Sequence, residues 1–142
     1  MTPLTLAQAQ SVIDGATAFA STNSLKPLCI VVLDEGGHVR ATARHDGATF
    51  GRVDVANAKA FGAISIGPNS RQLEQMALDR PHFMAGLIGA IGGAVVPVAG
   101  GVVILDADGN RIGAVGISGD TSDNDEAAAI AGIEAAGLTA AS

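Results

Sequence analysis

Apolar residues recur every three or four positions at the start of the chain, which is the spacing of one face of a helix. Leu6 and Val12 belong to this series. Just before it, Thr5 and Gln8 have the separation of a capping box, in which each side chain bonds the other residue's backbone N–H. The pattern therefore predicts a first helix over residues 6–20.

A different pattern follows over the next segment. Residues 28–34 are continuously apolar and rich in β-branched side chains, and residues 35–37 (Glu-Gly-Gly) are typical of a turn. Residues 38–44 then alternate between polar and apolar side chains, which predicts a strand covered on one face only. Together these segments predict a β-hairpin.

Helical spacing returns over residues 50–64, where Phe50, Val53 and Phe61 fall on one side and Lys59 falls on the opposite side. A short helix is predicted at residues 70–78, and three strands are predicted at residues 94–98, 102–105 and 111–118. A last helix, capped by Thr121 or Ser122, is predicted from residue 121 onward.

The order of these elements indicates the fold class. Strands come in groups and do not alternate with helices, so the chain is predicted to be α+β, with an antiparallel sheet of about five strands flanked by helices. Residues 106–110 (Asp-Ala-Asp-Gly-Asn) begin like a calcium loop but lack its later glutamate, and are predicted to be a turn. We find no repeat or linker, so residues 1–142 are expected to form one domain.

Composition narrows the possible partners. Only 15% of the residues are charged, against a usual value of about 25%, while 48% are hydrophobic. Part of the surface must then be apolar, and we expect a second subunit to cover it in a homo-oligomer. The net charge of -6 and the scattered cations argue against a nucleic-acid partner.

Location is the next inference. The single cysteine, Cys29, lies in an apolar run and cannot form an internal disulfide, which fits a reducing cytoplasm. The first residues lack a secretion signal. Residues 83–105 contain no charge and are long enough to span a membrane, but Pro97 and two Gly-Gly pairs interrupt them, so we predict no membrane span.

Several short segments, in order along the chain, carry a resemblance to a known family. They are residues 34–39 (Asp-Glu-Gly-Gly-His-Val), 43–48 (Ala-Arg-His-Asp-Gly-Ala), 56–60, 97–104, 113–119 and 123–126. In this collinear pattern the chain is similar to the GlcG/HbpS family, which includes the C-terminal domain of PduO. The resemblance implies a profilin-like antiparallel sheet, oligomers, and haem binding or haem degradation.

Two positions depart from the family pattern. His45 stands where an apolar or amide residue is usual, and Ala99 and Val103 flank a Gly-Gly pair near which a proline is common. Either difference would alter a pocket. Other family members accompany catabolic enzymes without an established role, so the resemblance leaves the activity open.

Candidate haem-binding residues combine the resemblance with residue chemistry. Haem requires an axial nitrogen, an apolar slot and a cation for its propionates, without a fixed spacing. The chain's three histidines supply nitrogens, and glycines at predicted strand ends allow an anionic ligand close to the backbone. The candidates are His38, Arg44, His45, His82, Gly100, Gly101 and Ser118. No zinc-type spacing of histidines is present, and we expect no metal centre.

The leading hypothesis is a cytoplasmic, oligomeric haem-binding protein, with haem degradation as the activity that the resemblance implies, and a ligand near His45, Lys59 and Gly100–Gly101. An alternative is a lyase, isomerase or hydratase acting on a small anionic substrate, with His45, Asp46 and Lys59 as acid–base groups. A second alternative is a noncatalytic accessory or sensor subunit. Each candidate also has a structural explanation: exposed histidines, a solvated lysine, and glycines at sheet bends.

Overall fold

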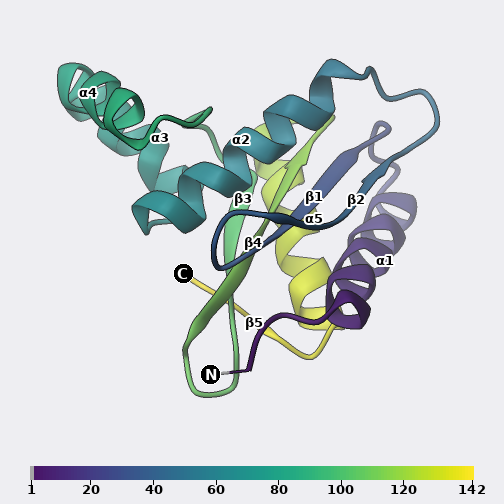
Figure 1. Cartoon of the computed structure of the whole chain (residues 1–142). Coiled ribbons are helices and arrows are strands. Elements are labelled where there is room, and N and C mark those ends of the chain that lie inside the picture. The colour runs from purple at the N-terminus through teal and green to yellow at the C-terminus, as the bar shows by residue number, and fades with distance from the viewer. Residues whose placement is uncertain (1) are drawn as a thin grey trace.

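The computed structural model describes residues 2–142 and contains a five-stranded antiparallel sheet with the strand order β2-β1-β4-β3-β5. Helices cover both of its faces (Figure 1). The elements are α1 (Leu6–Thr22), β1 (Cys29–Asp34), β2 (Val39–Arg44), α2 (Gly51–Ile66), α3 (Ser70–Asp79), α4 (Pro81–Ile91), β3 (Gly101–Leu105), β4 (Arg111–Ser118), α5 (Ser122–Ala135) and β5 (Thr139–Ala140). The predicted α+β class is confirmed.

The sheet separates two apolar layers. On one face, α1 and α5 pack side by side and bury residues such as Val12, Ile30 and Ile133. On the other face, α2 covers β1, β4 and β3 and buries a smaller cluster that includes Val31 and Ala60. Alternate residues of β1 face opposite layers, which explains why its sequence is continuously apolar.

The predicted starts of the first and last helices are confirmed by their caps. The Gln8 backbone N–H donates to Thr5 Oγ1 at 3.1 Å, and the Thr5 N–H donates to Gln8 Oε1 at 3.0 Å. At the start of α5, Thr121 Oγ1 accepts the N–H of Asn124. These bonds satisfy backbone donors that the first turn of a helix leaves free.

Helix α2 lies unusually close to the sheet. A Cβ atom at Gly116 would collide with the carbonyl oxygen of Ala56, and one at Gly101 would collide with that of Lys59. The helix therefore turns its small residues toward the sheet. The predicted face is correct at Val53 and Phe61, which pack against the buried cluster. It is wrong at two positions: Phe50 precedes the helix and is 78% exposed, whereas Lys59 is 3% exposed.

Helices α3 and α4 lead away from the sheet (Figure 1). Within α4 only Met84 is buried, although the helix is almost entirely apolar. The uncharged stretch divides into α4, a loop and β3. Among the described residues, none of the helices combines the length and apolarity needed to cross a membrane.

The strand predicted at 94–98 was wrong. Both edges of β3 are occupied, by β4 and by the two-residue β5 that the sequence pattern did not reveal. The apolar segment instead lies against α2, where the Val96 N–H donates to the Ala58 carbonyl oxygen and Val95 meets Gly62. The predicted turn over 106–110 is confirmed, with Asp106 accepting backbone N–H groups from Asp108 and Asn110.

Candidate functional site

Two candidate histidines flank strand β2. His38 precedes Val39 and His45 follows Arg44, so the strand separates them by about 20 Å at a rise of roughly 3.3 Å per residue. One haem iron in one chain cannot bind both. The chain therefore has two ends to consider: the hairpin end near His38 and the loop end near His45.

At the loop end, both ring nitrogens of His45 have partners. The Leu28 backbone N–H donates to Nδ1 at 3.2 Å, and Nε2 lies 2.9 Å from Thr17 Oγ1. A backbone N–H can only donate, so Nδ1 accepts and the proton of the neutral ring lies on Nε2. For Nε2 to bind an iron, the ring proton would have to lie on Nδ1. Nδ1–H would then face the Leu28 N–H, and two donors would oppose each other.

Two hollows flank the segment Lys26–Pro27 at this end. The one beside His45 has a volume of about 260 Å³ and is lined by Thr17, Ala20, Ser21, Leu25, Lys26, Pro27, His45 and Asp46. The other has a volume of about 220 Å³ and is lined by Lys26, Pro27, Gly47, Ala48, Thr49, Arg52 and Gly119. Both are smaller than the roughly 300–1,000 Å³ typical of ligand pockets.

Lys59 belongs to neither hollow. Its Nζ donates to the Ile117 carbonyl oxygen at 2.9 Å and to Asp125 Oδ2 at 3.2 Å, and the Lys59 and Asp125 side chains are 3% and 2% exposed. Burial lowers the pKa of Lys59, and the charge of Asp125 opposes this effect. The structure thus separates Lys59 from His45 and Asp46, so these three residues do not form one acid–base cluster.

Asp125 is a buried, paired residue that the sequence analysis did not single out, because carboxylates at the start of a helix are usually explained by the helix dipole. Its other oxygen, Oδ1, accepts the Asp120 N–H at 2.9 Å, and Asp120 Oδ2 accepts the Lys26 N–H at 2.8 Å. This last bond, with bonds from Asn124 and Thr121, lowers the pKa of Asp120 to about 2. The buried ion pair is therefore connected to the segment that divides the two hollows.

Three other candidates are buried at the sheet. Gly100, Gly101 and Ser118 have little or no exposed surface, and Gly100 and Gly101 lie against Lys59. Ser118 Oγ accepts a hydrogen bond from Arg52 Nη1 at 3.1 Å. Their role as ligand contacts stays a prediction, and in this structure Ser118 approaches the loop end through Arg52.

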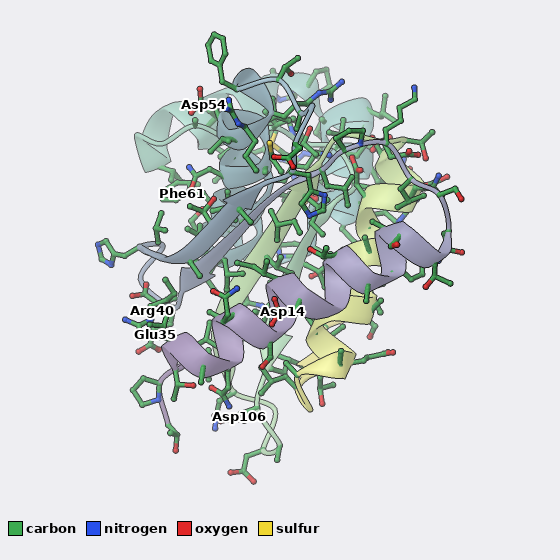
Figure 2. All side chains as sticks on the ribbon, turned by 90° about the vertical axis from the view of Figure 1, so that its right-hand side faces the viewer. Asp14, Glu35, Arg40, Asp54, Phe61 and Asp106 are labelled. Atoms are coloured by element: carbon green, nitrogen blue, oxygen red, sulfur yellow. The ribbon has the colours of Figure 1, made fainter. Side chains whose placement is uncertain are left out.

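At the hairpin end, His38 has a free nitrogen. Its side chain is 82% exposed, and Nδ1 lies 3.5 Å from Asp34 Oδ1. The Asp34 carboxylate also accepts the backbone N–H of His38, which is the main reason its pKa is lowered. A hollow of about 360 Å³ adjoins it, lined by Pro3, Leu4, Asp34, Glu35, Gly36, His38, Arg40 and Ile112. Figure 2 shows Glu35 and Arg40 together at this end, near the start of α1.

The remaining two candidates lie elsewhere. His82 is exposed in the first turn of α4. Arg44 is exposed at the end of β2, opposite Cys29. Burial raises the pKa of the Cys29 thiol, while the charges of Arg44 and Arg52 lower it, so both arginines lie near the loop end of β1. The predicted haem contacts are thus distributed over three regions.

Comparison with known proteins relates this architecture to a family. The model of the family described as haem degrading protein HbpS-like matches residues 4–134. HbpS is 28% identical in sequence, with a TM-score of 0.81 and coverage of 94% of this chain and 90% of that chain.

Two more distant structures share the fold. PduOC in complex with haem is 24% identical, with a TM-score of 0.86, and the alignment covers 99% of this chain and 100% of that chain. The ORFY protein of Klebsiella pneumoniae is also 24% identical, with a TM-score of 0.84 and coverage of 96% and 93%. No match is found among curated protein sequences.

Proposed function

Because this chain belongs to the HbpS-like family of haem degrading proteins, we propose that it binds haem. The observation that carries the proposal is the family match over residues 4–134. It is supported by the similarity to HbpS along 94% of the chain and by a fold shared with PduOC, which has been solved with haem bound.

The donor chemistry favours His38 as the axial ligand. A histidine that binds a metal usually directs its second nitrogen toward a carboxylate or carbonyl, which orients the ring and strengthens the ligand. His38 has this arrangement, with Asp34 beside Nδ1 and Nε2 free. His45 has the opposite arrangement, because its second nitrogen accepts an N–H.

The other residues of the hairpin end also fit the group. Arg40 would supply a cation for a propionate, and Leu4 and Ile112, each 3% exposed, would supply a small apolar surface. Asp34 lies 3.5 Å from the exposed ring of His38, where it would orient the ring once the iron is bound. Bound haem would supply an iron able to activate oxygen given a reductant, which is the chemistry that degradation of haem needs. We include haem degradation in the proposal on the family's description.

The proposal includes a homo-oligomer. A hollow of about 360 Å³ open to solvent covers only part of a porphyrin, so a second copy would be needed to enclose it. The apolar side chains that α4 leaves exposed offer a surface for such contacts, together with Leu78, which is 72% exposed. Sedimentation velocity tests this point: Phe83→Glu should lower the mass of the particle, whereas an unchanged mass would exclude α4 from the contact.

The free thiol of Cys29 is buried and unpaired in the described chain, which is consistent with a reducing compartment. On this ground we propose a cytoplasmic location. We also propose that the chain forms one domain.

Haemin titration followed in the Soret band tests haem binding. The wild type should show saturable, stoichiometric binding, and His38→Ala should weaken it at least tenfold, while His45→Ala and His82→Ala serve as matched controls. Asp34→Asn should weaken binding about 10- to 100-fold because it removes the carboxylate behind the ligand. The chain contains neither Trp nor Tyr, so its concentration is measured by peptide absorbance. Unsaturable binding that no variant changes would refute the function; a loss in another variant would refute the His38 assignment.

A further inference from the structure

We infer that the 220 Å³ hollow at the loop end is an oxyanion site, binding one carboxylate or phosphate group through Arg52 and Lys26. The inference goes beyond haem binding and does not depend on it, because the hollow is at the opposite end of β2 from His38. Its volume suits the head group of a small acid and is too small for a porphyrin ring.

The charge of the lining is the first argument. The chain has a formal net charge of -6, yet this hollow is lined by two cations and by no acidic residue. Among residues 2–142, the salt bridges engage His38, Lys59 and Arg71, and neither Lys26 nor Arg52 takes part in one. Two cations that line one cavity and form no salt bridge favour an anionic ligand.

The second argument is that Arg52 is held in position. Its Nη1 donates to Oγ of Ser118, which is fully buried, and this bond fixes one arm of the guanidinium at the wall. The side chain has five N–H donors, so four remain for a ligand. A guanidinium oriented in advance loses less entropy when it binds a carboxylate or phosphate.

The third argument is that the opposite wall is held by hydrogen bonds that lead to the buried pair of Lys59 and Asp125. The Lys26 N–H is bound by Asp120, the Asp120 N–H by Asp125, and Asp125 by Lys59. Gly119 has a φ of +155°, and a Cβ there would collide with the Pro27 carbonyl oxygen. Gly119 thus lies close against the Pro27 carbonyl group, and the hydrogen bond from the Lys26 N–H to Asp120 holds this segment. Lys59 and Asp125 act as positioning residues for the site.

The start of α2 lies at the same wall. Phe50 provides no side-chain cap, and the N–H groups of Arg52 and Val53 donate to the backbone carbonyl oxygens of Thr49 and Phe50. The positive end of a helix dipole favours an anion at this position. The helix end alone would not define a site; it supports one that Arg52 and Lys26 define.

The direct test is a ¹⁵N-HSQC titration of the haem-free protein with inorganic phosphate, and separately with acetate, at an ionic strength held constant with chloride. Amide shifts should saturate at residues 47–52 and at Gly119. Arg52→Gln and Lys26→Gln should each weaken binding about tenfold or more, the effect of losing a charge-assisted bond. Arg80→Gln removes the same charge near α4, which lies across the molecule, and should leave binding unchanged (Figure 1).

A parallel arm identifies the source of the anionic group. Protoporphyrin and its dimethyl ester are titrated against the wild type and Arg52→Gln. If Arg52→Gln weakens the binding of phosphate or acetate alone, the ligand is a small acid. If it weakens the binding of protoporphyrin and not of the dimethyl ester, the ligand is a propionate group. The inference is overturned if neither depends on Arg52, or if Arg80→Gln has the same effect. If the wild type binds phosphate but does not bind haem, the proposed function is refuted and this inference still holds.

Discussion

Replacing the buried pair of Lys59 and Asp125 should show strong coupling in a double-mutant cycle. Lys59→Met leaves the Asp125 carboxylate buried, at 1% exposure of the residue. Its remaining partner is the Asp120 N–H. Asp125→Leu leaves a buried ammonium whose remaining partner is the Ile117 carbonyl oxygen. Removing one member of a buried pair typically costs about 3–5 kcal/mol, a large part of a total stability of about 5–15 kcal/mol.

The double variant removes both charges and should be less destabilised than either single variant. Replacing a whole buried pair by apolar residues is often neutral or stabilising. Here the Asp120 N–H and the Ile117 carbonyl oxygen lose partners, which costs about 1–3 kcal/mol. The expected coupling energy is therefore about 3 kcal/mol or more. If the double variant loses the sum of the two single losses, the pair is not a unit and our reasoning is refuted.

The assay is urea unfolding followed by far-UV circular dichroism, because the chain has no Trp or Tyr for fluorescence. The matched control is an exposed ion pair, Arg71 with Glu126, joined at 3.0 Å with Arg71 51% exposed. Arg71→Met and Glu126→Leu should show a coupling of about 0–1 kcal/mol. Equal coupling in both cycles would mean that burial does not decide the energy.

The same pair predicts a dependence on alkaline pH. Burial lowers the pKa of Lys59 below its ordinary 10.5, so the unfolded chain binds more protons than the folded chain between the two values. The free energy of unfolding should therefore rise with pH in that window. Lys59→Met should lack this rise. Parallel curves for the two proteins below pH 10.5 would contradict the sign.

Two further predictions concern other parts of the molecule. Three N–H donors, of which the Lys26 backbone has the largest effect, lower the pKa of Asp120 to about 2. The stability that Asp120 contributes is therefore present above the pKa of the unfolded chain and is lost as the pH falls through about 2. In an acid titration followed by circular dichroism, Asp120→Asn should show a weaker dependence of stability on pH, and a curve equal to that of the wild type would contradict this. Gly116→Ala forces a Cβ into the Ala56 carbonyl oxygen and should cost about 3 kcal/mol or more, whereas Gly86→Ala, which meets nothing within 4 Å, should stabilise α4 by roughly 0.5–1 kcal/mol. Urea midpoints test both glycine variants, and equal changes would refute the packing argument.

Local signals in the sequence were sufficient for elements that are determined locally. The Thr5–Gln8 capping box marks the start of α1, and the Glu-Gly-Gly turn marks the β1–β2 hairpin, because both depend on residues a few positions apart. The strand expected at 94–98 failed for a non-local reason. Its edge of β3 is taken by residues 139–140, and no local pattern reports which edge is free.

The face of α2 was predicted correctly at Phe61 and wrongly at Phe50 and Lys59, because periodicity gives weight to large side chains. The small residues Ala56, Ala60 and Gly62 are buried where the helix meets the sheet or its neighbours. Small residues leave space for the backbone of the helix to touch the sheet, which is compatible only with glycines on the facing strands. The information was divided between two segments about 45–60 residues apart.

The same division hid the network behind the candidate site. Lys59 was considered as a solvated or catalytic group and Asp125 was not singled out, since each type of residue is usually exposed. Only their approach at 3.2 Å shows that each is the reason the other can be buried. Because that pair continues through Asp120 to the Lys26 backbone, the buried charges help to hold the segment that carries this surface cation. For a single lysine in an alanine-rich helix, a buried carboxylate partner far away in the sequence should therefore be considered before a catalytic role.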